Sequence, residues 1–267
     1  SMTNRTYWSR QGAEPLYPDI IWSKPENKQH AGKLLIIGGH AHGFSAPAGA
    51  YEYATRAGAG SVRVLIPDHI RKQLSAMQGP SLEITYAPST PSGSFASKSL
   101  ADMLDNTHWA DAILLAGDLG RNSETAIVLE KLVTKTNLAI TITKDAVDYF
   151  TAQPQSVLDR PNTCVVLSIA QLQKLVKNAK LPAAVTYGMD LMHLVDLLHD
   201  FTQLHSLYVV VKHHDSIVVA VNGQVSTTKT QSDIEDHWRV PVASRIAVWW
   251  LQNQNKPFQA ITSAVIE

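Results

Sequence analysis

Five small residues stand where an apolar run at residues 33–37 gives way to a helical pattern: Gly38, Gly39, Gly43, Ser45 and Ala46. Glycine lets a backbone approach a ligand closely, and the start of the following helix offers amides and a partial positive charge that suit phosphate. The spacing is not G-x-G-x-x-G, and a tight turn between strand and helix explains these glycines about as well. At this point both a phosphate-binding turn and a purely structural turn are open.

Two further glycines and two charged residues follow later apolar runs: Gly117, Gly120, Asp145 and Lys212. Polar groups at strand ends can reach a ligand, because sites in parallel sheets lie beyond the carboxyl ends of the strands. For Asp145 and Lys212, an ordinary polar role at a strand end and a contact with a ligand are equally well supported.

Histidines invite a metal hypothesis at His40, His42, His213, His214 and His237. Zinc sites need three or four ligands in a tetrahedral array, and nothing in the sequence brings these five imidazoles together. We therefore predict surface or hydrogen-bonded histidines and no metal site. His193, His199 and His205 recur every six residues on a predicted helix, so they do not share one face.

Short β-branched apolar runs alternate with longer periodic segments, which is typical of strands joined by crossover helices in a mostly parallel sheet. The predicted strands cover residues 33–37, 61–66, 111–116, 138–143, 163–167, 207–212 and 216–221. The last of them continues through Asn222-Gly223 into a hairpin, since this dipeptide supplies the positive φ angles of a type I′ turn. The predicted helices cover residues 46–58, 68–77, 97–104, 123–134, 170–177, 188–204, 241–254 and 257–266.

The chain has 267 residues, with 23 basic and 23 acidic side chains, and no run of five like charges. A nucleic-acid groove and an anionic membrane surface are therefore not expected as partners. The lone Cys164 and the absence of a long apolar stretch or a signal-like segment predict a cytoplasmic protein. Residues 1–32 are rich in proline and aromatics, so we expect an irregular N-terminal arm on a single domain spanning 33–267.

Four segments together resemble the ATP- or ADP-dependent NAD(P)H-hydrate dehydratases: residues 33–66, the Gly-Asp-Leu-Gly at 117–120, the strand 139–147 and the Val-Val-Val-Lys at 209–212. The resemblance covers roughly residues 30–265 and implies an α/β, three-layer ribokinase-like sandwich with helices on both faces of a mostly parallel sheet. It also implies a nucleotide cleft for ATP or ADP with Mg²⁺. The cofactor-binding positions that it implies are Gly38, Gly39, Gly43, Ser45, Ala46, Gly117, Gly120, Asp145 and Lys212.

The departures from this family concentrate where its reaction occurs. A Gly-Ser/Thr-Gly-Asp turn opens the penultimate helix in the family, where, as the resemblance implies, its amides hold a phosphate and its Asp handles the proton. Here Trp238-Arg239-Val240-Pro241 stands over that turn. Valine resists the left-handed backbone that glycine permits, and proline has no N–H to donate. The expected catalytic Asp falls at Pro241, and general-base catalysis is typically worth about 10²–10⁴ in rate.

Two further segments differ from the family. The substrate-side His-Pro-Gly-Glu loop reads Ser168-Ile169-Ala170-Gln171, and Lys212 is followed by His213-His214 instead of Gly-Ala. Three acids upstream could replace the missing one: Asp233, Glu235 and Asp236. A capping box or solvated turn explains the stretch Ser232 to Glu235 better.

Three functions therefore compete. The first is a dehydratase-like protein that retains a nucleotide-type cleft but has weak or lost catalysis. The second is an active dehydratase, a lyase, that uses one of the displaced acids. The third is a non-catalytic structural or regulatory subunit whose cleft is filled by His213, His214 and Trp238. Adjacent Trp249 and Trp250 on one helix, together with the resemblance, also predict a homo-oligomer.

Overall fold

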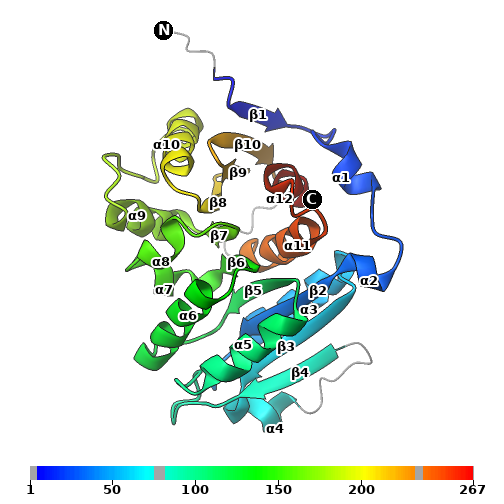
Figure 1. Cartoon of the computed structure of the whole chain (residues 1–267). Helices are drawn as coiled ribbons and strands as arrows, with labels where there is room; N and C mark the ends of the chain where they lie inside the picture. The colour runs from blue at the N-terminus through cyan, green and yellow to red at the C-terminus, as the bar shows by residue number, and fades with distance from the viewer. Residues whose placement is uncertain (1–4, 75–81, 232–236, 267) are drawn as a thin grey trace.

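The computed structural model describes residues 5–74, 82–231 and 237–266. In these ranges the strands form one 10-stranded sheet in the order β1-β10-β9-β8-β7-β6-β5-β2-β3-β4 (Figure 1). The strands are β1 (Trp8–Gln11), β2 (Lys33–Gly38), β3 (Ser61–Pro67), β4 (Leu82–Ala87), β5 (Ala112–Gly117), β6 (Ala139–Thr143), β7 (Thr163–Leu167), β8 (Tyr208–His213), β9 (Ser216–Val221) and β10 (Gln224–Lys229).

Neighbouring strands from β4 to β8 run parallel, and only the β8-β9-β10 meander is antiparallel. The predicted mostly parallel α/β sheet is confirmed. Buried apolar residues alternate in direction along each central strand: in β2, Leu35 and Ile37 pack on one face while Leu34 and Ile36 pack on the other. Both faces are therefore apolar, and each must be covered by helices.

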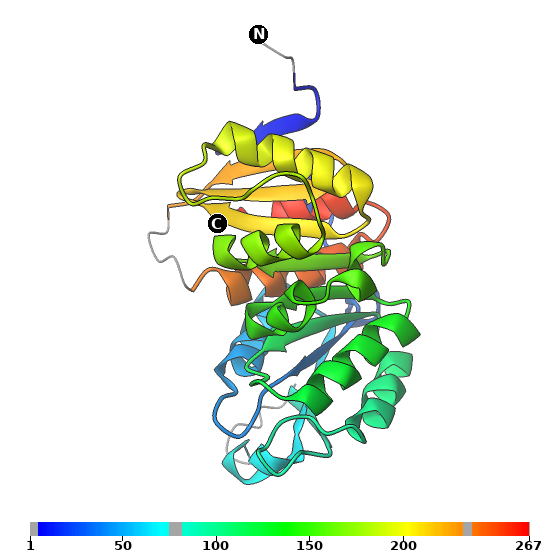
Figure 2. The same cartoon turned by 90° about the vertical axis from the view of Figure 1, so that its left-hand side faces the viewer.

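Helices cover both faces, as the three-layer prediction requires. One face carries α3 (Ser45–Arg56), α11 (Arg239–Gln252) and α12 (Pro257–Ala264). The other carries α5 (Ser99–Trp109), α6 (Ser123–Lys135), α7 (Asp148–Thr151), α8 (Gln155–Leu158), α9 (Ile169–Asn178) and α10 (Leu191–Leu204). Figure 2 shows α10, in yellow, lying along the orange strands of the meander. The remaining short helices are α1 (Pro18–Trp22), α2 (Lys28–Ala31), η1 (Asp68–Ile70), α4 (Arg71–Leu74) and η2 (Lys144–Ala146).

Several element boundaries differ from the sequence predictions. Strand β4 is not among the predicted strands, although Leu82 to Ala87 alternates apolar and polar residues as an edge strand does. The helix predicted at 68–77 is described only to Leu74, as η1 and α4, and its last residues lie outside the described ranges. Helix α10 begins at Leu191 rather than at 188, because the Asp190 side chain accepts the His193 amide as an N-cap.

The predicted hairpin is confirmed. Asn222 and Gly223 join β9 to β10 with φ angles of 50° and 87°, the two positive values that the turn needs.

The N-terminal segment is more regular than expected. Strand β1 extends the sheet by pairing in parallel with β10, and the Trp8 indole donates to Thr227 Oγ1 at 3.0 Å. Tyr7 stacks on His199 with ring centroids 3.6 Å apart, whereas Trp22 is 79% exposed and holds nothing in place. Backbone pairing with the free edge of β10 makes residues 8–11 a strand, despite the prolines that follow. No helix in the described residues is long and apolar enough to cross a membrane.

Candidate functional site

A polar cleft lies at the carboxyl edge of the parallel strands, where β5, β6 and β7 end. Its larger part, about 460 Å³, is lined by Asp118, Lys144, Asp145, Asp148, Ser168, Ala170, Gln171, Lys174 and Arg239. A smaller part, about 220 Å³, lies between the starts of α3 and α11 and is lined by Ser45, Ala46, Gly49, Tyr53, Lys144, His237, Val240 and Pro241. Lys144 borders both parts, and together they make up the candidate site.

Close packing of the backbone is enough to explain the glycines at this edge. Gly39 N–H donates to the carbonyl of Gly117 at 3.0 Å, which brings the ends of β2 and β5 together. A Cβ at Gly38 would lie 2.6 Å from the same carbonyl oxygen. Gly117 itself has φ 104°, and a Cβ there would lie 2.7 Å from Lys144 Cβ. These positions require glycine whether or not a ligand binds.

The carboxylate of Asp118, the residue after Gly117, caps the start of α3. Its Oδ2 accepts the Ala46 amide at 2.7 Å and the Ser45 hydroxyl at 3.1 Å. The residue in the N-cap position, Phe44, has no side-chain oxygen that could make these bonds. The third helical residue, Pro47, has no N–H. The helix start that the sequence offered to a phosphate thus already holds an anion from the same chain.

Two local features place Asp118 in this position. Its backbone has φ 56°, a left-handed conformation that aspartate tolerates better than most residues. Its carbonyl oxygen lies 2.7 Å from His40 Nδ1, so the imidazole donates to it from the β2–α3 turn. The Lys144 ammonium lies 3.8 Å from Oδ1, and its charge partly balances the carboxylate.

Asp145 likewise accepts backbone amides, in this case those of the neighbouring turn at residues 117–120. Its Oδ2 accepts the backbone amides of Leu119 at 3.0 Å and Gly120 at 3.3 Å. The hydroxyl of Tyr149 donates to the Gly120 carbonyl and holds the turn from its other side. Successive amides that converge on one point form an anion-binding concavity. Here that concavity is occupied by Asp145.

The environment of Asp145 disfavours its charged form. Burial raises the pKa of this carboxyl above its ordinary value, and the nearby negative charge of Asp118 raises it further. The backbone amides of the turn act in the opposite direction and are the smaller influence. Its second oxygen, Oδ1, is buried without a hydrogen-bond partner among the described residues. Asp145 is therefore a polar group at the bottom of the cleft whose proton can be held at higher pH than usual.

Helix α11 begins two residues earlier than predicted, at Arg239, so Pro241 is its third residue rather than its first. The first helical residues normally leave their N–H groups without partners inside the helix. Pro241 has none to offer, and the N-cap residue Trp238 makes no side-chain cap. The position predicted to lack the catalytic Asp lies in the first turn of α11 and borders the smaller part of the cleft.

The segment that replaces the family's His-Pro-Gly-Glu loop forms the capped start of α9. Ser168 Oγ accepts the Gln171 amide at 3.2 Å, and Gln171 Oε1 accepts the Ser168 amide at 3.0 Å. The Gln171 side chain also donates to the Lys144 carbonyl at 2.9 Å and to Asp148 Oδ1 at 3.0 Å. Gln171, a residue of the predicted substrate loop, thus connects α9, η2 and α7 by hydrogen bonds.

Lys212 lies apart from the other predicted cofactor-binding residues. It stands on β8, two strands from β6, and is 8% exposed. It lines a separate pocket of about 180 Å³ with Ser168, Ile169, Tyr187, His213, His214 and Trp238. His213 donates from Nε2 to the Met189 carbonyl at 2.7 Å. The two imidazoles and the indole therefore line a pocket and do not fill it.

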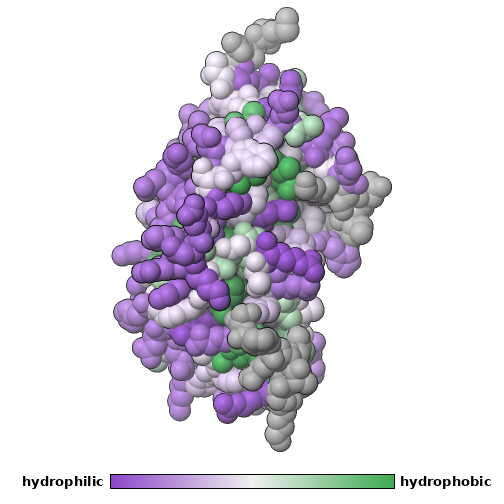
Figure 3. All heavy atoms as spheres, turned by 90° about the vertical axis from the view of Figure 1, so that its right-hand side faces the viewer, coloured by the Kyte–Doolittle hydropathy of each residue, from purple (hydrophilic) through white to green (hydrophobic). Residues whose placement is uncertain are grey.

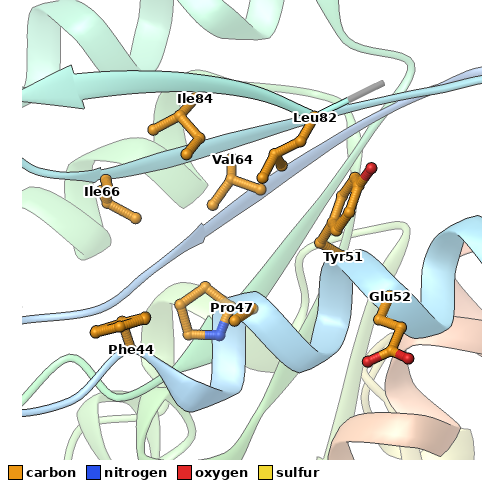
Figure 4. Close-up of a pocket in the computed structure, with 9 residues that line it drawn as sticks. Phe44, Pro47, Tyr51, Glu52, Val64, Ile66, Leu82 and Ile84 are labelled. Carbon is orange, nitrogen blue, oxygen red and sulfur yellow. The ribbon is translucent and has the colours of Figure 1, made fainter. Parts of the chain in front are cut away.

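A second kind of pocket lies on the far side of α3 (Figure 4). It has a volume of about 240 Å³, and its walls are Phe44, Pro47, Ala48, Tyr51, Glu52, Val64, Ile66, Leu82 and Ile84. Its acid, Glu52, forms an ion pair with Arg56 one helical turn later. The rest of the lining is apolar, apart from the Tyr51 hydroxyl, so the pocket is suited mainly to an apolar ligand group. On the face shown in Figure 3, hydrophilic residues dominate and hydrophobic ones are visible only in small areas.

The histidines do not converge on a metal site. His40 and His42 have ring centroids 5.9 Å apart, and His213 and His214 form a second pair at 4.4 Å. Within the residues described, no group of three His, Cys, Asp or Glu side chains could hold a metal ion. Asp233, Glu235 and Asp236, the predicted replacement acids, lie outside the described residues.

All nine predicted cofactor-binding residues lie at the carboxyl edge of the sheet, with Lys212 near the end of β8 and the other eight around the ends of β2, β5 and β6: Gly38, Gly39, Gly43, Ser45, Ala46, Gly117, Gly120 and Asp145. Their role in binding a cofactor stays a prediction. Sequence reasoning assigned no role to Asp118 or Lys144, and it named Gln171 only as a departure from the family's substrate-side loop. The signal for Asp118 is an acid between two glycines, before a helix start whose own N-cap residue is phenylalanine.

No family model matches the sequence, and a search of curated proteins found no match. Solved structures do match. A ribokinase-like superfamily protein of Enterococcus faecalis V583 superposes with a TM-score of 0.75 at 17% identity, over 99% of this chain and 87% of its own. The chain has a ribokinase-like fold. A hypothetical protein of Streptococcus mutans gives a TM-score of 0.70 at 16% identity, over 92% and 84% of the two chains.

An ADP/ATP-dependent NAD(P)H-hydrate dehydratase of Bacillus subtilis, co-crystallised with ATP and Mg²⁺, shares this ribokinase-like fold. Its TM-score is 0.64 at 12% identity, over 90% of this chain and 79% of its own. Identities this low establish the fold alone, and function must be argued from the site.

Proposed function

We propose that this chain is an NAD(P)H-hydrate dehydratase-like protein that retains the cleft of its fold but has weak or lost dehydratase activity. One observation carries the proposal: several of the amide groups that could hold a phosphate at this edge are occupied by side chains of the same protein or missing. Asp118 accepts the amide at the start of α3, Asp145 accepts those of the 117–120 turn, and Pro241 removes one from α11.

The ligand suggested by the fold is ATP or ADP with Mg²⁺, because the Bacillus subtilis dehydratase was co-crystallised with ATP and Mg²⁺. The residues present fit such a group poorly. A triphosphate would have to displace the Asp118 and Asp145 carboxylates or lie beside their negative charges. We therefore assign no step of a reaction to a bound nucleotide or metal.

The loss of the acid is the second support. The family's Asp falls at Pro241, which borders the cleft and has no group that can take or give a proton. Of the acids that line the cleft, Asp118 and Asp145 accept backbone amides, and Asp148 accepts the Gln171 side chain. Because general acid–base catalysis typically contributes about 10²–10⁴ in rate, its absence alone would leave a very slow enzyme.

The test is the regeneration of NADH from its hydrate by the purified protein with ATP or ADP and Mg²⁺, followed by absorbance. A dehydratase with an intact Gly-Ser/Thr-Gly-Asp turn serves as the control. We expect turnover more than about a hundredfold below that control. Turnover within that factor would overturn the proposal and favour an active enzyme that uses Asp233, Glu235 or Asp236, each then tested by alanine substitution.

A further inference from the structure

The start of α3 contains a complete anion contact made within the chain. Asp118 Oδ2 receives one backbone N–H, from Ala46 at 2.7 Å, and one hydroxyl, from Ser45 at 3.1 Å. Lys144 Nζ faces the other oxygen at 3.8 Å. A helix N-terminus with a serine hydroxyl and a lysine nearby offers the groups that would otherwise bind a phosphate oxygen.

The occupant is tethered, which makes it hard to displace. The Asp118 backbone is fixed by the Gly39 to Gly117 hydrogen bond before it and by the His40 to Asp118 carbonyl contact at 2.7 Å. A tethered group acts at an effective concentration in the millimolar range or higher, and a free anion must compete against it.

Neighbouring negative charges also oppose the binding of a free phosphate at the start of α3. Asp145 and Asp148 line the same part of the cleft as Asp118, and Asp145 accepts the adjacent amides of the 117–120 turn. A phosphate dianion that approached α3 would meet these carboxylates at close range. Lys144 is already beside Asp118, so it adds no new attraction unless that pair opens.

We propose that Asp118 is a specificity-determining residue that acts as a built-in anion and excludes phosphate from the start of α3. The ligand of this cleft then carries a neutral or positively charged group at this position instead of a phosphate. This inference deepens the proposed function and rests on it for the identity of the cleft.

The test measures the binding of inorganic phosphate and of pyrophosphate by titration calorimetry and by thermal shift, with sodium chloride at matched ionic strength. Asp118→Gly removes the carboxylate and suits the φ of 56°. Asp118→Asn keeps the left-handed backbone and an acceptor oxygen but removes the charge. Asn162→Gly is the matched control, because Asn162 is an exposed residue with the same φ of 56° far from the cleft.

We expect Asp118→Gly to bind phosphate about tenfold or more tighter than the unaltered protein. Asp118→Asn should show a smaller gain, and Asn162→Gly should show none. Equal affinity in the unaltered protein and Asp118→Gly, whether both bind or neither does, would overturn the inference. If Asp118→Gly does not fold by circular dichroism, Asp118→Asn decides: no gain there also overturns it.

The binding result is separable from the turnover result. Substantial dehydratase turnover by the unaltered protein would end the proposed function without changing what phosphate binding to Asp118→Gly shows. A gain in phosphate binding without any turnover would support both. Absence of that gain in a protein that also lacks turnover would remove the role given to Asp118 and leave the proposed function supported by Asp145 and Pro241.

Discussion

Gln171 Oε1 accepts a hydrogen bond from Arg239 Nη1 at 3.1 Å, which connects the start of α9 to the start of α11. The same oxygen accepts the Ser168 amide, and the amide nitrogen donates to Lys144 and Asp148. One neutral side chain thus joins the two segments that differ most from the dehydratase pattern. We infer that these substitutions are coupled, because a hydrogen bond joins the two helix starts.

We predict that Gln171→Ala destabilises the protein by about 2 kcal/mol, since it removes a helix cap and leaves buried polar groups without partners. Gln173→Ala is the control on the same helix, because Gln173 donates a single bond to the Val185 carbonyl at 3.0 Å. That variant should lose about 1 kcal/mol or less. Urea unfolding measures both. Equal losses in the two variants would show that Gln171 has no special role.

A second prediction concerns pH. Because burial raises the folded-state pKa of Asp145, its contribution to stability is fully present below the unfolded value of about 3.8 and is lost as pH rises through the raised value. Each unit of the rise is worth about 1.4 kcal/mol. Asp145→Asn should therefore flatten the decline of the unfolding free energy that begins as the pH rises above about 3.8. Parallel stability–pH curves for the two proteins would contradict this assignment.

A third prediction concerns the N-terminal segment. Gln11 is 4% exposed, donates to Thr228 Oγ1 at 3.0 Å and to the Thr262 carbonyl at 2.8 Å, and accepts the Leu16 amide. Gln11→Ala should lower the free energy of unfolding by about 1–3 kcal/mol, because these buried groups would lose their hydrogen-bond partner. Trp22→Ala should change stability by less than about 0.5 kcal/mol, since Trp22 is largely exposed. A larger effect at Trp22 than at Gln11 would mean that the segment is held differently.

The central strands could be predicted because their apolar runs are long and β-branched, and because both faces of a parallel sheet are buried. Strand β4 shows the limit of that signal. Its Leu82, Ile84 and Tyr86 are only half-buried, so at the sheet edge a short alternating pattern resembles a loop. Residues 8–11 show another limit, since their strand depends on the free edge of β10, which lies more than two hundred residues later.

The position of the candidate site could be predicted from the sequence, but the side chains that already occupy its backbone amides could not. Glycines and strand ends located the cleft, because backbone geometry restricts residue choice there. Asp118 and Ala46 are 72 residues apart, and no local pattern shows that the carboxylate of one accepts the amide of the other. The sequence therefore leaves a phosphate-binding turn and a structural turn equally open, because the anion at this helix start is supplied by a distant turn.

The last prediction tests whether the absence of an acid at position 241 would alone account for the proposed loss of dehydratase activity. Pro241→Asp returns a carboxylate to the first turn of α11, where the helix dipole favours negative charge, so the fold should tolerate it. We expect no turnover of NADH hydrate, because Asp118 and Asp145 still occupy the neighbouring amides. Pro257→Asp, at the start of α12, controls for the effect of the substitution on stability. Turnover by Pro241→Asp would show that the occupied amides do not block the reaction and that the acid was the decisive loss.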